Sequence, residues 1–232
     1  MEAADRVIQL AEDMRHVRRR INAAHIGAGV NIIDIDHTYI DESVYIGAGT
    51  TVYPGAILEG QTAIGADCVL GANVRLVNCT LGKGVEVWYS MMKDCTVGEL
   101  TQIGPFAYIR PGSMIGSRVR IGNFVEIKNS NIGDGTSISH LTYVGDSDVG
   151  NDVNFGCGTV TVNYDGKTKH RTTIGDNAFI GCNTNLIAPV TVGIGAYTAA
   201  GATITLDVPD GSLAVARARQ TNLEGYAKKY LE

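Results

Sequence analysis

An aliphatic side chain recurs at every sixth position along most of this chain. A period of six fits neither a 3.6-residue helix nor an alternating strand, but it suits a short extended segment followed by a tight corner. Two contractions of a single residue, before Ile132 and Val149, interrupt the later part of the pattern. The members are Ile40, Ile46, Val52, Leu58, Ile64, Leu70 and Leu76, then, after a slip, Val85, Met91, Val97, Ile103, Ile109, Ile115, Ile121, Ile127, Ile132, Ile138, Val144, Val149 and Phe155, and finally Ile174, Ile180, Leu186 and Val192.

Hexapeptide repeats of this kind predict a parallel β-helix. Three segments make a triangular coil of about eighteen residues, with the aliphatic side chain pointing inward and a small residue such as Thr50, Ala56, Cys68 or Thr80 near the corner. Glycines are expected to supply corner conformations that residues with a Cβ resist. Each coil buries its aliphatic side chains against its neighbours, so stability sums along a column of about nine coils.

Segments outside the repeat predict three further features. Residues 5–24 should form a helix, because Val7, Leu10, Met14, Val17 and Ile21 fall on one stripe. Its arginines are better explained by a solvated face than by an anion site. A lapse of the repeat predicts a projecting loop over 158–173. The expected segments are therefore 1–38 (helix and connection), 39–208 (β-helix with that loop) and 209–232 (C-terminal arm).

Composition narrows the function. A formal net charge of -5 argues against nonspecific nucleic-acid binding, which needs excess Lys and Arg. No apolar run approaches the ~20 residues that cross a bilayer, and the N-terminus lacks the apolar core of a signal peptide, so we expect a cytoplasmic protein without membrane insertion. The five cysteines show no CxxC spacing, which predicts reduced thiols rather than a disulfide framework or a zinc site.

The register of the repeat places polar side chains. Arg110 and Lys128 lie eighteen residues apart, each immediately after an inward aliphatic residue, so they should stack on one side of adjacent coils. Stacked cations favour an anionic ligand such as a phosphate. From spacing alone, a pair of solvated surface residues remains an equally good interpretation.

Glu126 and Tyr143 are also one coil apart, His140 lies at the corner before Tyr143, and Asn154 precedes Phe155 one coil further on. These residues are expected to gather with Arg110 and Lys128 around one edge. A neutral imidazole there would act as a general base, and Glu126 would orient it. The alternative for a lone histidine is a corner residue bonded to backbone carbonyls.

Several motifs resemble one bacterial family. They are Gly104-Pro105-Phe106-Ala107-Tyr108-Ile109-Arg110-Pro111-Gly112, Gly122-Asn123-Phe124-Val125-Glu126-Ile127-Lys128-Asn129, His140-Leu141-Thr142-Tyr143-Val144-Gly145-Asp146, Asn154-Phe155-Gly156 and Asn163-Tyr164-Asp165-Gly166. The ordered set is similar to the acetyltransferase half of the bifunctional N-acetylglucosamine-1-phosphate uridylyltransferase/glucosamine-1-phosphate acetyltransferase. The resemblance runs from the N-terminal helix to about Gly225.

The resemblance implies a left-handed β-helix, a homotrimer with sites between subunits, and acetyl transfer from acetyl-CoA to glucosamine 1-phosphate without a metal. This step serves the synthesis of UDP-N-acetylglucosamine and cell-envelope precursors. It makes His140 the general base and implies that the sugar phosphate is bound by Arg110, Lys128, Tyr143, Asn154 and Lys169. It places acetyl-CoA against Cys157, Asn163, Tyr164, Cys182, Ala200 and Arg217.

This chain departs from the family at three of these positions. Cys157 and Cys182 stand where alanine and serine are usual, and Leu223 replaces a tail lysine. The chain also has no Gly-rich nucleotide loop, so uridylyl transfer is not expected of it. A nucleophilic Cys157, another amino-sugar acyltransferase, a zinc hydratase and a catalytically silent trimeric scaffold are the weaker alternatives.

Overall fold

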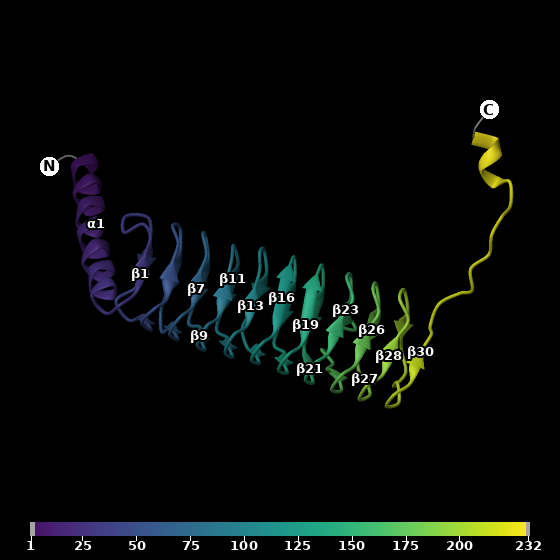
Figure 1. Ribbon diagram of the computed structural model, residues 1–232. Helices are drawn as coiled ribbons and strands as arrows, with labels where there is room; N and C mark the ends of the chain where they lie inside the picture. Colours follow the sequence, from purple (N-terminus) through teal and green to yellow (C-terminus); the bar gives the residue numbers. More distant parts are fainter. Residues whose placement is uncertain (1–2, 231–232) are drawn as a thin grey trace.

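In a computed structural model, the chain forms a single column of stacked coils with a helix at one end (Figure 1). The structure describes residues 3–230. Helix α1 (Ala3–Gly27) confirms the predicted helix and extends it at both ends. The last segment leaves the opposite end of the column and carries the short 3-10 helix η1 (Tyr226–Tyr230). Residues 1–2 and 231–232 of the predicted terminal segments lie outside the described residues.

The coils build three parallel sheets, one on each side of a triangular prism. The 11-stranded sheet consists, in spatial order, of β1 (Asn31–Ile32), β4 (Thr51–Val52), β7 (Val69–Leu70), β10 (Glu86–Val87), β13 (Gln102–Ile103), β16 (Arg120–Asn123), β19 (Ser137–His140), β22 (Asn154–Phe155), β25 (Phe179–Ile180), β28 (Tyr197–Thr198) and β30 (Leu213–Ala214). The 10-stranded sheet consists of β2 (Tyr39–Ile40), β5 (Ile57–Glu59), β8 (Arg75–Val77), β11 (Met91–Lys93), β14 (Tyr108–Ile109), β17 (Glu126–Lys128), β20 (Tyr143–Gly145), β23 (Val160–Val162), β26 (Asn185–Ile187) and β29 (Thr203–Ile204). The 9-stranded sheet consists of β3 (Tyr45–Ile46), β6 (Ala63–Ile64), β9 (Thr80–Leu81), β12 (Thr96–Val97), β15 (Met114–Ile115), β18 (Asn131–Ile132), β21 (Ser147–Val149), β24 (Thr172–Ile174) and β27 (Val190–Val192).

The predicted aliphatic series forms the core, with two corrections. Met92, not Met91, points inward and is fully buried, pairing with Leu76 and Ile109 in the neighbouring coils. Val85 is buried, but the strand residue that faces the axis is Val87. The steps from Leu76 to Leu81 and from Val87 to Met92 are five residues, and the sequence hid these contractions because Val85 and Met91 are also apolar.

Small residues occupy the inside of the corners, and buried hydroxyls there bridge successive coils. The Thr50 hydroxyl donates to the Gly65 carbonyl at 2.9 Å and accepts from the Cys68 N–H at 3.1 Å. Such pairing offsets the cost of burying a polar group. The predicted corner position of Thr80 is wrong: Thr80 is exposed, and Cys79 is the buried residue.

After Phe155, where the aliphatic repeat lapses, the next inward position is occupied by a polar residue. Thr161 faces inward in β23 and is fully buried. Its hydroxyl accepts from the Gly145 N–H at 2.7 Å and contacts the Gly145 carbonyl at 3.1 Å. The chain then leaves the prism as a loop between β23 and β24, closed by an antiparallel bridge between Tyr164 and Lys169.

Among residues 3–230, fifteen residues other than glycine adopt positive φ, and they lie at corners, so glycine supplies only part of the turn geometry. Asn129, Leu141 and Asp146 are three of them, with φ of 47°, 45° and 48°. The left-handed region disfavours residues with a Cβ. The neighbouring coil holds most of these residues there, because their backbone N–H donates to the coil before it, as Leu141 does to the Asn123 carbonyl at 3.1 Å.

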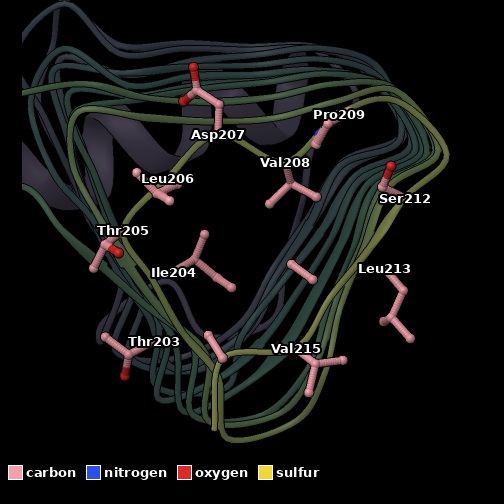
Figure 2. Close-up of a pocket in the computed structure, with 12 residues that line it drawn as sticks. Thr203, Ile204, Thr205, Leu206, Asp207, Val208, Pro209, Ser212, Leu213 and Val215 are labelled. Atoms are coloured by element: carbon pink, nitrogen blue, oxygen red, sulfur yellow. The ribbon is translucent and has the colours of Figure 1, made fainter.

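The two ends of the column differ. Asn22 in α1 is fully buried and its side chain donates to the carbonyls of Ile35 and Thr38, which fixes the helix to the first coil. At the other end, the last coil has no successor, and Figure 2 shows Ile204 and Val208 pointing into a cavity of about 220 Å³ at the open end of the triangle. None of the helices in residues 3–230 is long and apolar enough to span a membrane.

We expect the inward and outward residues of one strand to differ sharply in their effect on stability. In β13, Ile103 is 1 % exposed and Gln102 is exposed. Ile103→Ala should lower the free energy of unfolding by about 2–5 kcal/mol, because it leaves a cavity between packed coils. Gln102→Ala should change it by less than about 0.5 kcal/mol. Urea unfolding measures both, and equal effects would contradict the inward assignment.

Candidate functional site

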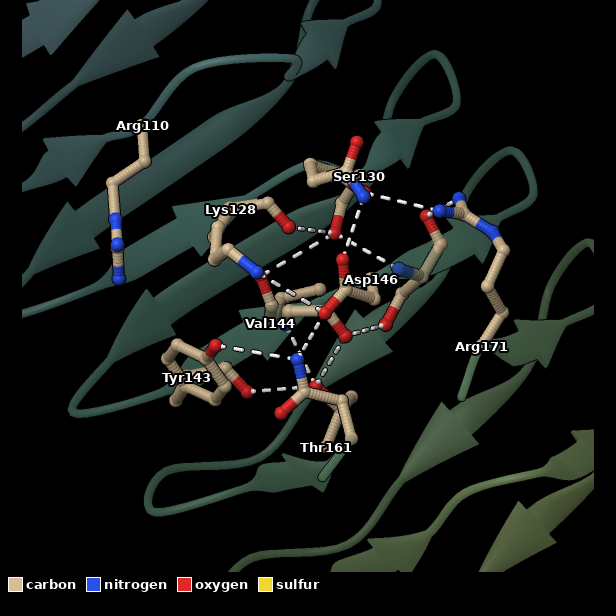
Figure 3. A network of polar contacts seen from close by, with 12 residues as sticks. Arg110, Lys128, Ser130, Tyr143, Val144, Asp146, Thr161 and Arg171 are labelled. Atoms are coloured by element: carbon tan, nitrogen blue, oxygen red, sulfur yellow. Dashed lines mark hydrogen bonds and ion pairs between the residues drawn. The ribbon is translucent and has the colours of Figure 1, made fainter. Parts of the chain in front are cut away.

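The register of the β-helix brings the predicted phosphate-binding cations onto the outer face of the 10-stranded sheet. Ile109 pairs with Ile127, so Arg110 and Lys128, one residue further on, stack in adjacent coils. Glu126 pairs with Tyr143, and Lys128 with Gly145. The predicted stacking within each of these two pairs is therefore present. Figure 3 shows Arg110, Lys128 and Tyr143 around this surface.

Glu126 does not orient His140. Its carboxylate accepts a hydrogen bond from Arg110 Nη1 at 2.7 Å, and both side chains are a little over one third exposed. This contact raises the pKa of Arg110 above its usual value. An exposed pair of this kind adds little to stability, but it fixes the direction of the guanidinium on the sheet.

His140 ends β19 on the corner between the 11-stranded and 10-stranded sheets, and Asn123 is its orienting partner. The two residues pair in register, and His140 Nδ1 lies 2.9 Å from Asn123 Oδ1. Because an amide oxygen only accepts, Nδ1 is the donor in this contact. In the neutral ring this leaves the Nε2 lone pair free to accept a proton.

A buried carboxylate that the sequence analysis gave no role lies beneath the cations. Asp146 is 4 % exposed and contacts Lys128 Nζ at 3.3 Å, Asn129 Nδ2 at 2.6 Å and the Asn163 amide (Figure 3). Burial acts to raise the pKa of Asp146, but the hydrogen bonds from Asn129, Asn163 and Lys128 outweigh it and hold the pKa below its usual value. Asp146 directly follows Gly145, the residue that pairs with Lys128 in the neighbouring coil.

The projecting loop places one further cation above this network. Lys169 lies close enough to Lys128 for that neighbour to lower its pKa. At the tip, Asp165 accepts from the N–H groups of Lys167 and Thr168, both at 2.7 Å, and from His170 at 2.8 Å. Arg171 fixes the base of the loop through Asp148 at 2.6 Å. Arg110, Lys128 and Lys169 therefore lie near one another on one surface. Three cations close together favour the binding of a multiply charged anion.

The residues predicted to contact acetyl-CoA divide into two groups. In the first group, Cys157, Cys182 and Ala200 lie at the same corner as His140 in the coils that follow it. Each comes two residues after a strand residue that pairs with its counterpart in the neighbouring coil. Arg217 lies beside Gly201, next to this corner. Asn163 is instead buried against Asp146 and 3.5 Å from the Tyr143 hydroxyl, and Tyr164 is exposed on the loop.

Asn154 lies apart from the cationic surface. It is in β22, on the outer face of the 11-stranded sheet, whereas Lys128 and Tyr143 are in the 10-stranded sheet. Leu223 is 69 % exposed in the C-terminal segment. Among residues 3–230, no group of three or more His, Cys, Asp and Glu side chains is placed to hold a metal ion.

The six-residue repeat that builds this fold is also found by comparison with known proteins, where it is typical of hexapeptide transferases. Residues 94–129 match the bacterial transferase hexapeptide family, described as six repeats. With the three parallel sheets, this confirms the predicted fold class, a left-handed parallel β-helix. A crystal structure of a UDP-N-acetylglucosamine acyltransferase shares the fold, with a TM-score of 0.53 and 21 % identity over 80 % of this chain and 71 % of that one.

Within that class, the chain is similar to the bifunctional protein GlmU, which confirms the resemblance seen in the motifs. Identity is 56 % over 222 residues to the protein of Brevibacillus brevis and 55 % to that of Geobacillus sp.. These alignments cover 96 % of this chain and 48 % of each relative. The chain thus spans about half the length of the curated relatives it matches.

Asp146→Asn should destabilise the protein, because it removes a buried negative charge from beside Lys128 and leaves donors without their acceptor. We expect a loss of about 1–3 kcal/mol in the free energy of unfolding. Lys128→Met combined with Asp146→Asn should recover part of the loss, since no unpaired ammonium remains. Urea unfolding of the four members of this cycle measures the coupling between the two residues.

The stability difference between wild type and Asp146→Asn should also depend on pH. The folded pKa of Asp146 is depressed, so its stabilisation is complete above the unfolded value of 3.8 and is lost as pH falls through the lower folded pKa. The stability gap between wild type and Asp146→Asn should therefore narrow only below pH 3.8. A gap that narrows between neutrality and pH 5 would contradict a depressed pKa.

Proposed function

We propose that this chain transfers the acetyl group of acetyl-CoA to the amine of glucosamine 1-phosphate, giving N-acetylglucosamine 1-phosphate. The observation that carries the proposal is a cationic surface next to an oriented imidazole. Lys128, Arg110 and Lys169 supply the charge, and His140 supplies the base. The 56 % identity to a bifunctional GlmU supports the same assignment.

The chemistry requires both parts. The cations hold the sugar phosphate, and Tyr143, in the coil after Glu126 on the same sheet, completes the sugar site. Asn154, on the neighbouring sheet, has no part in it. The substrate amine is an ammonium ion in water, and it must lose a proton before it attacks a thioester. Nε2 of His140 takes that proton, and the Asn123 amide keeps the ring in the tautomer that can do so. The nitrogen then bonds to the carbonyl carbon and a tetrahedral oxyanion forms. Its collapse breaks the C–S bond and expels coenzyme A thiolate, which takes the second proton from the former amine nitrogen and leaves as the thiol.

Asp146 is a positioning residue in this scheme. Its carboxylate accepts hydrogen bonds from the Lys128 ammonium and from the Asn163 side-chain amide, and so fixes the position of both side chains. A lysine fixed by a buried carboxylate loses less conformational freedom when it binds a phosphate. The Asp146 charge also reduces the repulsion between Lys128 and Lys169 before the substrate arrives.

We further propose a homotrimer with the sites between subunits, in the cytoplasm. An exposed apolar column supports the assembly: Tyr89, Phe106, Phe124 and Leu141 stack along the corner next to His140 and are 44–58 % exposed. Phe106 and Phe124 are stacked with ring centroids 5.5 Å apart. Apolar side chains gathered in this way are typical of an interface. The corner that carries Cys182 and Ala200 is open in a single chain and would be closed by a neighbouring copy.

His140→Ala should abolish most of the acetyl transfer. Loss of a general base lowers kcat by about 10²–10⁴-fold, while the Kd for acetyl-CoA should change little. Release of coenzyme A with glucosamine 1-phosphate as acceptor measures the rate, and calorimetry measures acetyl-CoA binding. His16→Ala, an imidazole on exposed α1, is the matched control. Normal turnover of His140→Ala would remove His140 as the base, and absence of acetyl-CoA binding in wild type would favour a silent scaffold.

Lys128→Ala should weaken recognition of the phosphate rather than the chemical step. Loss of one charge-assisted hydrogen bond costs about 1.5–3 kcal/mol, so KM for glucosamine 1-phosphate should rise at least about tenfold. With glucosamine as acceptor, the variant and wild type should have similar kcat/KM. Steady-state kinetics with the two acceptors gives the comparison, and an equal loss with both would contradict a phosphate contact.

A further inference from the structure

The five cysteines fall into two environments. Cys68, Cys79 and Cys95 are buried inside the prism, whereas Cys157 is partly exposed and Cys182 is exposed. Burial raises the pKa of the Cys68 thiol, which makes it a poor nucleophile. Only Cys157 and Cys182 are therefore placed to react with a molecule from solution.

Cys157 and Cys182 stand in neighbouring coils at equivalent positions. Phe155 pairs with Ile180, and each cysteine follows its member of that pair by two residues. The corner is tied together directly, because the N–H of Asn183 donates to the Cys157 carbonyl at 2.7 Å. Neighbouring strands in a sheet are about 4.8 Å apart, which falls within the range of about 4.4–6.8 Å between the Cα atoms of a disulfide.

The coil before Cys157 carries His140 at the same position, and the coil after Cys182 carries Ala200. The thiol pair is thus continuous with the corner where the acetyl thioester is proposed to lie. The reaction proposed there releases a thiol, coenzyme A, so the corner holds protein thiols and a substrate thiol together.

We propose that Cys157 and Cys182 form a redox-sensitive pair that reacts with the disulfide of coenzyme A and thereby closes the acetyl-CoA site. This inference rests on the proposed function. The Cys182 thiolate attacks one sulfur of the coenzyme A disulfide, forming a mixed disulfide and expelling one coenzyme A thiolate. The Cys157 thiolate then attacks the Cys182 sulfur, forming the Cys157–Cys182 bond and expelling the second. Two protein thiols are oxidised, and one disulfide is reduced to two thiols.

The cross-link would block acetyl transfer because it occupies the corner on which the thioester must rest. It would be reversible, since an excess of reduced thiol runs both exchanges backwards. The site would thereby respond to the ratio of the disulfide to the thiol form of its own coenzyme. The buried Cys79 and Cys95, whose sulfurs are 3.6 Å apart in adjacent coils, form an internal comparison pair that is close but enclosed.

The test uses the reduced full chain and coenzyme A disulfide as the probe. Mass spectrometry of peptides should show a Cys157–Cys182 cross-link with release of two coenzyme A molecules per chain, while Cys79 and Cys95 remain reduced. Acetyl transfer should fall in proportion to the cross-link, and dithiothreitol should restore it. Acetyl-CoA at about ten times its Kd should slow the oxidation about tenfold, because bound enzyme is protected.

Two variants separate the steps. Cys157→Ala should retain one coenzyme A on Cys182, because the resolving thiol is gone, and Cys182→Ser should form no cross-link. Glutathione disulfide at the same concentration is the control for recognition and should react more slowly than coenzyme A disulfide. Equal rates with both disulfides, no protection by acetyl-CoA, or no cross-link in wild type would each overturn the inference.

Failure of this inference is distinguishable from failure of the proposed function. If the reduced protein transfers acetyl groups but forms no cross-link, only the thiol switch is wrong. If the reduced protein has no acetyl transfer and acetyl-CoA gives no protection, the proposed coenzyme site itself is wrong.

Discussion

The parallel register between successive coils is the constraint on which the rest of the structure depends. Each inward aliphatic residue lies directly over its counterpart, as Ile109, Ile127 and Val144 do, and these contacts form the core enclosed by the three sheets. A slip by one residue would exchange inward and outward side chains. The same register therefore determines both the packing of the core and the positions of Arg110 and Lys128 on the outer surface.

Because of this register, the cations and His140 lie in different parts of the fold and are held by different kinds of partner. The cations stand on a flat sheet face, where a buried carboxylate, Asp146, keeps Lys128 in place at the cost of desolvating a charge. His140 stands on a corner, where a neutral amide from Asn123 holds it without adding charge. The two groups therefore lie in different electrostatic environments, Lys128 beside a buried carboxylate and His140 beside a neutral amide.

The sequence predicted the core and the stacking of Arg110 on Lys128 because both follow from one period. It misassigned Met91 and Thr80, since five-residue steps between inward residues, next to runs of apolar or small residues, leave the inward position ambiguous. It chose Glu126 to orient His140 on the basis of charge, but Arg110 is nearer to Glu126 and Asn123 shares the His140 register. The contraction before Ile132 pairs Lys128 with Gly145 and leaves Asp146 at the next position, and nothing in a single sequence shows that a corner carboxylate is buried and accepts three hydrogen bonds.

The corner that begins at Asn123 shows how a repetitive fold changes chemistry without changing shape. In successive coils the same position holds an amide, an imidazole, two thiols and a methyl group, at Asn123, His140, Cys157, Cys182 and Ala200. The carbonyls of Asn123, Cys157 and Cys182 each accept a backbone N–H from the next coil, so these levels share one backbone arrangement and differ in the side chain. A substitution from alanine or serine to cysteine at such a position leaves the coil intact while adding a group that can exchange electrons, and this is why a new reactivity can arise there without a new fold.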